Sequence, residues 1–113
     1  MRGTITVIHP DGTVESKVLD HAAKLDDLKS AIGGGYMEKI PRFTKFKTDT
    51  GVVDCIALCD EDGSRKNMSP NRTATLAWSA SLAATDPAQP VVLNTLVGPV
   101  AILYGDKEWM KAL

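Results

Sequence analysis

Polar and apolar residues alternate near the start of the chain in the way that predicts a β-hairpin. A β-branched run from Thr4 to His9 leads into Pro10-Asp11-Gly12, where proline fixes φ and glycine accepts a positive φ. A second strand is expected from Thr13 to Leu19, with residues dividing between its two sides. One side holds Val14, Ser16 and Val18, and the other holds Glu15, Lys17 and Leu19.

Helical spacing follows the hairpin. Leu25, Leu28 and Ile32 recur on one face and predict a helix that ends at about Ile32. The three glycines 33–35 come directly after it, so we expect Gly33 or Gly34 to cap the helix with a positive φ. A phosphate-binding loop opens a helix, whereas this glycine run closes one, and the pattern therefore favours a cap and turn.

The middle of the chain reads as strands and turns. Tyr36–Ile40 predicts a strand ended by Pro41, and residues 42–47 form a basic-aromatic stretch. After a turn at residues 49–51, the apolar run from Val52 to Cys59 predicts one strand buried on both faces. On such a strand Cys55 and Cys59 lie about 13 Å apart, too far for a disulfide or a shared metal ion. We expect two buried, reduced thiols.

A second helix is expected from Asn71, its cap, to about Leu82. Its apolar stripe is assigned to Leu76, Ala77, Ala80 and Ala83. Two further β runs follow at residues 91–93 and 96–104, where Pro99 marks an edge, a strand start or a bulge, and residues 107–113 predict a terminal helical turn. The expected fold is α+β: a single domain over residues 1–113 with a mostly antiparallel sheet of about five to six strands, an N-terminal hairpin and two helices.

Composition bears on the kind of partner. A content of 43% hydrophobic and 24% charged residues in 113 residues is that of one ordinary globular domain. The net charge of −1 lacks the basic excess of most nucleic-acid-binding proteins. No segment resembles a secretory signal or a membrane span, so we expect a cytoplasmic protein without a membrane partner.

Candidate chemistry is sparse. The only histidines, His9 and His21, lie near predicted strand ends and not in a nucleophile turn. His9, Asp11, Asp20 and His21 are metal-ligand types whose spacing does not bring them together. We therefore expect no catalytic residue, no metal and no cofactor.

Two segments are candidates for binding. If the stretch at residues 42–47 is extended, Phe43, Lys45 and Lys47 form one side, a surface suited to phosphates or stacked bases. The alternative is a strand whose phenyl rings pack inward. At the second helix, Asn71 and Arg72 stand beside free backbone amides, which suits an anion or a carboxylate. The alternative there is a helix cap followed by an exposed arginine.

Three sequence blocks form a recognisable pattern. They are Gly34-Gly35-Tyr36-Met37-Glu38, the segment from Asp60-Glu61-Asp62-Gly63 to Pro70-Asn71-Arg72-Thr73-Ala74-Thr75, and Val97-Gly98-Pro99-Val100. These blocks resemble a small domain family of unknown function found in phages, prophages and plasmids. With the N-terminal hairpin, the resemblance spans most of the chain. Gly33 and Ser69 depart from the family pattern, as does the long loop before Val91. The resemblance implies an accessory protein of a mobile genome, of a kind that commonly binds host components, including defence systems. It implies no reaction.

The predicted function is that of a non-enzymatic accessory binding protein. It would act as a counter-defence factor by sequestering a nucleotide signal or by occluding a host protein. The candidate binding residues are Tyr36, Glu38, Asn71 and Arg72, with Arg42 and Lys45 as a second patch. Arg72 has two candidate partners, an internal brace to Glu38 or an external anion with Tyr36 stacking nearby. The alternative function is a nucleic-acid-binding accessory factor that uses the basic-aromatic stretch.

Overall fold

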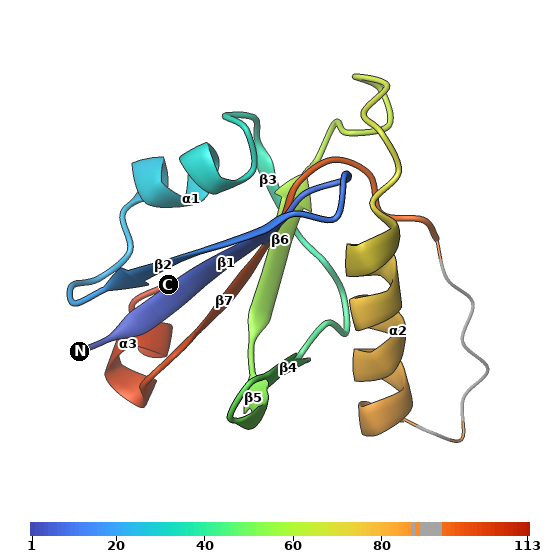
Figure 1. Cartoon of the computed structure of the whole chain (residues 1–113). Helices are drawn as coiled ribbons and strands as arrows, with labels where there is room; N and C mark the ends of the chain where they lie inside the picture. Colours follow the sequence, from blue (N-terminus) through green and yellow to red (C-terminus); the bar gives the residue numbers. More distant parts are fainter. Residues whose placement is uncertain (87, 89–93) are drawn as a thin grey trace.

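The computed structural model describes residues 1–86, 88 and 94–113, in which seven strands and three helices are found (Figure 1). In chain order these are β1 Gly3–Ile8, β2 Val14–Leu19, α1 Leu25–Ala31, β3 Met37–Lys39, β4 Lys45–Thr48, β5 Gly51–Asp54, β6 Ile56–Asp60, α2 Arg72–Thr85, β7 Val100–Gly105 and α3 Lys107–Lys111. No helix in the described ranges has the length and apolarity needed to cross a bilayer.

The strands form one large sheet and one small one. The large sheet has the order β2-β1-β7-β6-β3, and every neighbouring pair in it is antiparallel. The small sheet pairs β4 with β5. The α+β class, the mostly antiparallel sheet and the N-terminal hairpin are confirmed. The third helix, α3, is the terminal helical turn that the sequence predicts at residues 107–113.

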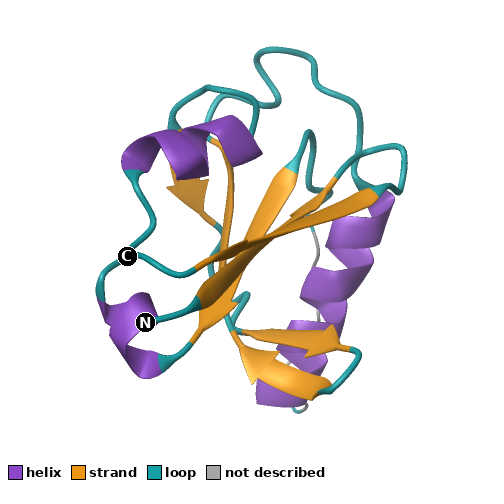
Figure 2. Ribbon diagram, turned by 60° about the vertical axis from the view of Figure 1, so that its left-hand side comes forward, coloured by secondary structure: helices purple, strands orange, loops and turns teal. Residues whose placement is uncertain are grey.

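Helices cover both faces of the large sheet. Figure 2 shows α2 on one side and α1 with α3 on the other. On the α2 side, Trp78 and Leu82 pack against Ile8 and Ile102. On the other side, Trp109 of α3 is fully buried against Gly3, where an added Cβ would lie 1.9 Å from the indole ring. Each face therefore has its own hydrophobic core, and the sheet lies between the two.

The hairpin and the first helix follow their sequence signals. Along β2, Ser16 faces Thr6 and Lys17 faces Ile5, so consecutive side chains alternate between the two faces as expected. Helix α1 ends one residue earlier than expected, with Ile32 as its C-cap. Gly33 and Gly34 both have positive φ, at 90° and 95°, which confirms the glycine cap.

The expected single strand from Val52 to Cys59 is wrong, because the chain breaks at Cys55. The part before Cys55 is β5, in the small sheet, and Val52 is 64% exposed. The part after it is β6, in the large sheet. Cys55 turns inward, where its N–H donates to the Thr44 carbonyl oxygen at 2.9 Å. Both cysteines are free, as expected, although Cys59 is only partly buried.

The helix α2 and its Asn71 cap are confirmed, but of the predicted stripe only Ala77 packs against the core, and it is only partly buried. The buried residues are Ala74, Trp78, Ser81 and Leu82, while Leu76 is 58% exposed. Residues two apart differ by about 200° around a helix, so burying the large Trp78 ring turns Leu76 to solvent. The inward face therefore includes Ser81, whose hydroxyl bonds to the chain at Thr44 and Lys45.

The final strand begins later than expected. The run at residues 96–104 predicts strand throughout, but β7 starts at Val100, directly after Pro99. Gly98, with φ at 71°, donates its N–H to the Ser69 carbonyl oxygen at 2.8 Å and bends the chain before the strand. Pro99 thus marks a strand start, one of the three alternatives. The expected run at residues 91–93 lies outside the described residues.

Candidate functional site

A tight turn between α1 and β3 holds Tyr36 out in solvent. The turn begins at Gly33, after the fully buried Ile32, and its backbone is fixed at the other end by a hydrogen bond from Glu61 N–H to the Tyr36 carbonyl oxygen (2.9 Å). The Tyr36 side chain is 72% exposed. We call residues 33–36 the Tyr36 turn. In this turn the backbone is held by hydrogen bonds, while the aromatic ring projects into solvent.

Lys29 gives this ring a cationic neighbour. It lies in the last turn of α1, and its ammonium nitrogen is 5.9 Å from the centroid of the Tyr36 ring. A cation at this distance is attracted by the electrons of the ring face. The aromatic ring and the positive charge therefore occupy the same part of the surface.

An ion pair supports the Tyr36 turn from the loop after β6. Asp60 has a buried carboxylate that accepts a hydrogen bond from Lys66 Nζ at 2.7 Å and one from Asp62 N–H at 2.8 Å. The hydrogen bond from Lys66 is the main cause that lowers the pKa of Asp60 below its ordinary value. A Cβ at Gly35 would lie 2.3 Å from the Asp60 carboxylate and 2.7 Å from Lys66 Nζ. The pair therefore sits directly against the turn, which requires glycine there.

Asn71 has a structural role in place of the expected ligand contact. Its side chain is fully buried, and its Oδ1 caps α2 by accepting from Ala74 N–H at 3.0 Å. Its Nδ2 donates to the carbonyl oxygens of Ile8 (2.8 Å) and Gly98 (2.9 Å). Every polar atom of the amide group is occupied within the fold, because the helix N-terminus docks against the ends of β1 and the loop before β7.

Arg72 and Glu38 are both exposed, and the internal brace between them, one of the two candidate partners of Arg72, is not formed. Within the described part of the chain, none of the hydrogen bonds or ion pairs involves the Arg72 guanidinium. Glu38 lies on β3, where it faces Cys59 of β6. The structure places Tyr36 and Arg72 in different segments, the α1–β3 turn and the first residue of α2, and records no contact between them.

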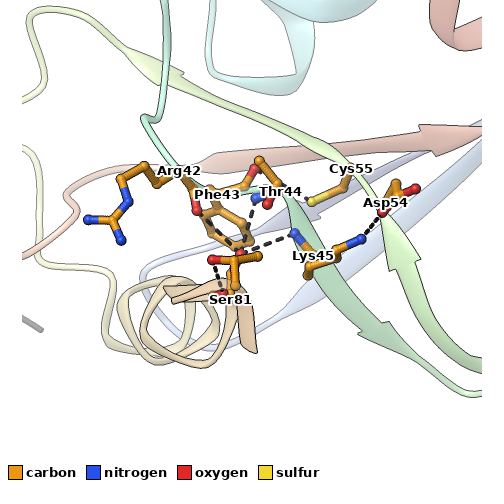
Figure 3. Close-up of polar contacts among 8 residues, drawn as sticks. Arg42, Phe43, Thr44, Lys45, Asp54, Cys55 and Ser81 are labelled. Atoms are coloured by element: carbon orange, nitrogen blue, oxygen red, sulfur yellow. Dashed lines mark hydrogen bonds and ion pairs between the residues drawn. The ribbon is translucent and has the colours of Figure 1, made fainter. Parts of the chain in front are cut away.

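The basic-aromatic stretch packs against α2, as Figure 3 shows. Phe43 is buried in the core, so it does not form a stacking surface with the lysines. The Ser81 hydroxyl of α2 accepts from the N–H groups of Thr44 and Lys45, both at 3.1 Å, and donates to the Arg42 carbonyl oxygen at 3.4 Å. Ser81 is the inward serine of α2, and it pins this loop to the helix.

Two charged residues of that stretch, Arg42 and Lys45, already have partners. Arg42 has a positive φ of 62°, and its guanidinium lies 3.5 Å from the Asp86 carboxylate. The Lys45 ammonium pairs with Asp54 of β5. These ion pairs reduce the positive charge that the second predicted patch offers to a nucleic acid.

Among the described residues, three of the surface hollows lie away from the Tyr36 turn. The first, of about 560 Å³, lies between α1 and the β1–β2 hairpin, and the second, of about 610 Å³, borders the hairpin turn. His9 and Glu15 line both, with His9 Nε2 2.8 Å from Glu15 Oε1. The third lies between β5 and α3. Neither Tyr36 nor Arg72 lines any of the three, and no group of three potential metal ligands gathers in the described residues.

Sequence reasoning missed Lys29 and Lys66 as neighbours of the Tyr36 turn. Lys29 precedes Tyr36 by seven residues, and the glycine cap lies between them, so the position of Lys29 beside the ring depends on the sharp reversal at Gly33 and Gly34. Lys66 comes from the loop that follows β6, 30 positions after Tyr36 in the sequence. The sequence weakly indicated that Lys29 lies near Tyr36, because Lys29 is in the last helical turn before the cap. It gave no indication that Lys66 does.

Comparisons with known proteins give this chain no relative. No protein-family model matches it, and searches of curated proteins and of solved structures found no significant match. The resemblance to the phage family stays a prediction.

Proposed function

We propose that this chain is a non-enzymatic binding protein that covers a surface of a partner protein, with Tyr36 as the central contact. The observation that carries the proposal is the 72% exposure of Tyr36 on a turn whose backbone is fixed by hydrogen bonds. Tyrosine is enriched among the residues that dominate protein interfaces, because it buries a large rigid surface at low entropic cost.

The shape around Tyr36 favours a protein partner over a nucleotide. Small ligands bind in concave sites that bury most of their surface. Tyr36 projects from a turn and lines none of the three hollows. A projecting ring is better suited to insert into a pocket on a partner. Of the two modes predicted for this protein, occlusion of a protein surface is therefore favoured over sequestration of a nucleotide signal.

The charges beside the ring indicate the chemistry of the partner surface. Lys29 is at cation–π distance, and Lys66 lies against Gly35 with its side chain 45% exposed. Because Lys66 is already paired with Asp60, the Lys29 ammonium at the edge of the ring is the group that suits a pocket with an acidic rim. If the resemblance to phage proteins holds, that partner is a host protein, such as a defence component.

Two observations weigh against the rival functions. The buried Phe43 and the ion pairs of Arg42 and Lys45 weaken the case for a nucleic-acid-binding surface. Burial raises the pKa of both cysteine thiols to about 11, which makes them poor nucleophiles at neutral pH. No reaction is part of the proposal.

The test is capture from host-cell extract by the tagged chain, followed by mass spectrometry. We expect a partner that the wild type and Tyr36→Phe retain and that Tyr36→Ala and Lys29→Glu lose. Leu76→Ala is the matched control, because it also removes an exposed hydrophobic side chain, on α2. A partner retained equally by Tyr36→Ala and the wild type would contradict the proposal. Nucleotide binding in calorimetry that depends on Tyr36, with no protein captured, would favour sequestration instead.

A further inference from the structure

Strand β2 forms an open edge of the large sheet. It is the terminal strand in the order β2-β1-β7-β6-β3, and no other strand of the described residues pairs with its outer side (Figure 1). Its side chains are unusually open for a strand: Val14 and Val18 are 55% and 53% exposed, and those of Glu15 and Lys17 are 75% and 66% exposed. An edge of this kind is a template for pairing with another strand.

The hairpin decides which backbone groups face outward. His9 N–H donates to the Thr13 carbonyl oxygen at 2.9 Å, at the position that continues the β1–β2 register. Bonded and non-bonded pairs alternate along an antiparallel ladder. The odd-numbered residues of β2 therefore bond to β1, and the even-numbered ones, Val14, Ser16 and Val18, present their N–H and C=O groups to the open edge.

The sequence of this edge is self-complementary. Val14-Glu15-Ser16-Lys17-Val18 has valine at both ends, opposite charges on either side of the centre, and serine at the centre. We propose that β2 pairs antiparallel with β2 of a second copy of the chain, with Ser16 on the two-fold axis. Valine then faces valine, and Glu15 of each copy faces Lys17 of the other.

Competing registers are disfavoured by charge. Outward-facing residues of one copy must meet outward-facing residues of the other, so near the middle of the strand the axis can pass only through Glu15, Ser16 or Lys17. An axis at Glu15 places two glutamates opposite each other, and an axis at Lys17 places two lysines opposite each other. Like charges directly opposite destabilise a strand pair, whereas opposite charges stabilise it. Only the axis at Ser16 gives attractive pairs.

The charged pairs fall where side chains approach most closely. Glu15 and Lys17 occupy the non-bonded positions of the new ladder, where opposite Cα atoms are about 4.5 Å apart. Within one copy, Glu15 already lies 2.8 Å from His9 Nε2, and Lys17 Nζ lies 3.6 Å from the Asp27 carboxylate. Pairing thus joins these two contacts across the axis into one row of polar side chains, with the Glu15–Lys17 ion pairs of the two copies at its centre. On the opposite face of the sheet, Val14 and Val18 of one copy pack against Val18 and Val14 of the other.

Sedimentation velocity from micromolar to millimolar protein tests the proposal. We expect the wild type to form a dimer, and the single variants Glu15→Lys and Lys17→Glu each to weaken it by about tenfold or more, because each places like charges opposite each other. An equimolar mixture of the two variants should form a heterodimer, since every cross-strand contact then pairs lysine with glutamate. This rescue cannot come from contacts within one copy.

Two further measurements separate pairing from folding. Ser16→Pro removes an outward-facing N–H without removing a backbone hydrogen bond to β1, although it also removes the 2.9 Å hydrogen bond between the Ser16 and Thr6 hydroxyl groups. It should therefore abolish the dimer while thermal melting still shows a folded chain. Tyr36→Ala should dimerise like the wild type, because the pairing does not depend on the proposed Tyr36 contact. A wild type that remains monomeric at every concentration would overturn the proposal. So would a dimer that both charge reversals leave unchanged, or a mixture of the two variants that stays monomeric.

Discussion

Asn71 Nδ2 donates a 2.8 Å hydrogen bond to the carbonyl oxygen of Ile8, a residue 63 positions earlier in the chain. The same amide nitrogen also reaches Gly98, so one buried side chain connects the end of β1, the start of α2 and the approach to β7. Asn71 lies in one of the sequence blocks on which the predicted phage resemblance rests, and its role in this fold is to hold three segments together.

Replacing Asn71 should destabilise the fold strongly. We expect Asn71→Ala to lower the free energy of unfolding by about 3 kcal/mol, because the helix cap is lost and two buried carbonyl groups lose a donor. Urea denaturation followed by circular dichroism measures this. The neighbouring exposed residue provides the control: Arg72→Ala should stay within about 0.5 kcal/mol of the wild type.

A second substitution at the same position separates the two roles of the amide. Asn71→Asp keeps an oxygen for the Ala74 N–H but places a carboxylate oxygen against the carbonyls of Ile8 and Gly98. It should therefore remain clearly less stable than the wild type. Wild-type stability in Asn71→Asp would show that the two carbonyl contacts contribute little.

Ser81 should contribute far more to stability than Ser79, the other serine of α2. Ser81→Ala removes the acceptor for the N–H groups of Thr44 and Lys45, and we expect a loss of about 2 kcal/mol in the free energy of unfolding. Ser79→Ala, on the same helix, should change it by less than about 0.5 kcal/mol. Equal effects of the two substitutions in urea denaturation would mean that the loop at residues 42–45 is not held by this hydroxyl.

The ion pair between Asp60 and Lys66 should make stability depend on acid pH. The pKa of Asp60 is lower in the folded state than in the unfolded chain, so its contribution is present above about pH 4 and is lost as pH falls through the folded-state pKa. Lys66→Met should melt below the wild type at neutral pH, and the difference should vanish in strong acid, where Asp60 is protonated in both proteins.

The control for this experiment is the adjacent exposed residue. Arg65 makes no ion pair among the described residues, so Arg65→Met should follow the wild type at every pH. The prediction fails if the melting difference between Lys66→Met and the wild type is the same at pH values above and below the Asp60 titration.

Both cysteines should react slowly in the native state. Burial is the main cause that raises each thiol pKa from 9.0 to about 11, which lowers the thiolate fraction near pH 8 about 100-fold. Labelling with an aromatic disulfide reagent should be slow, speed up as pH rises toward 11, and become complete at once in denaturant. Cys59 is less buried than Cys55, so Cys55→Ala should label faster than Cys59→Ala. Rapid labelling of both native thiols would contradict this burial.

Local chemistry in the sequence was sufficient for the hairpin, the glycine cap and the Asn71 cap. Each depends on residues a few positions apart: the turn at Pro10-Asp11-Gly12, the positive φ at Gly33 and Gly34, and the Asn71 oxygen that reaches Ala74. Backbone conformation and helix capping are set within one turn of chain, so a single sequence carries enough information to predict them.

Only the tertiary structure decided which faces are buried and which side chains meet. Nothing local determines that α2 buries Trp78 with Ser81, that the chain leaves one sheet for another at Cys55, or that Asn71 is enclosed. These depend on surfaces distant in sequence that must fit together at close packing, and on buried polar groups that must all find partners. The sequence predicted Tyr36 as a contact residue. The position of Lys29 over its ring, and of Lys66 against Gly35 in the same turn, depends on the fold, which brings three separate segments together.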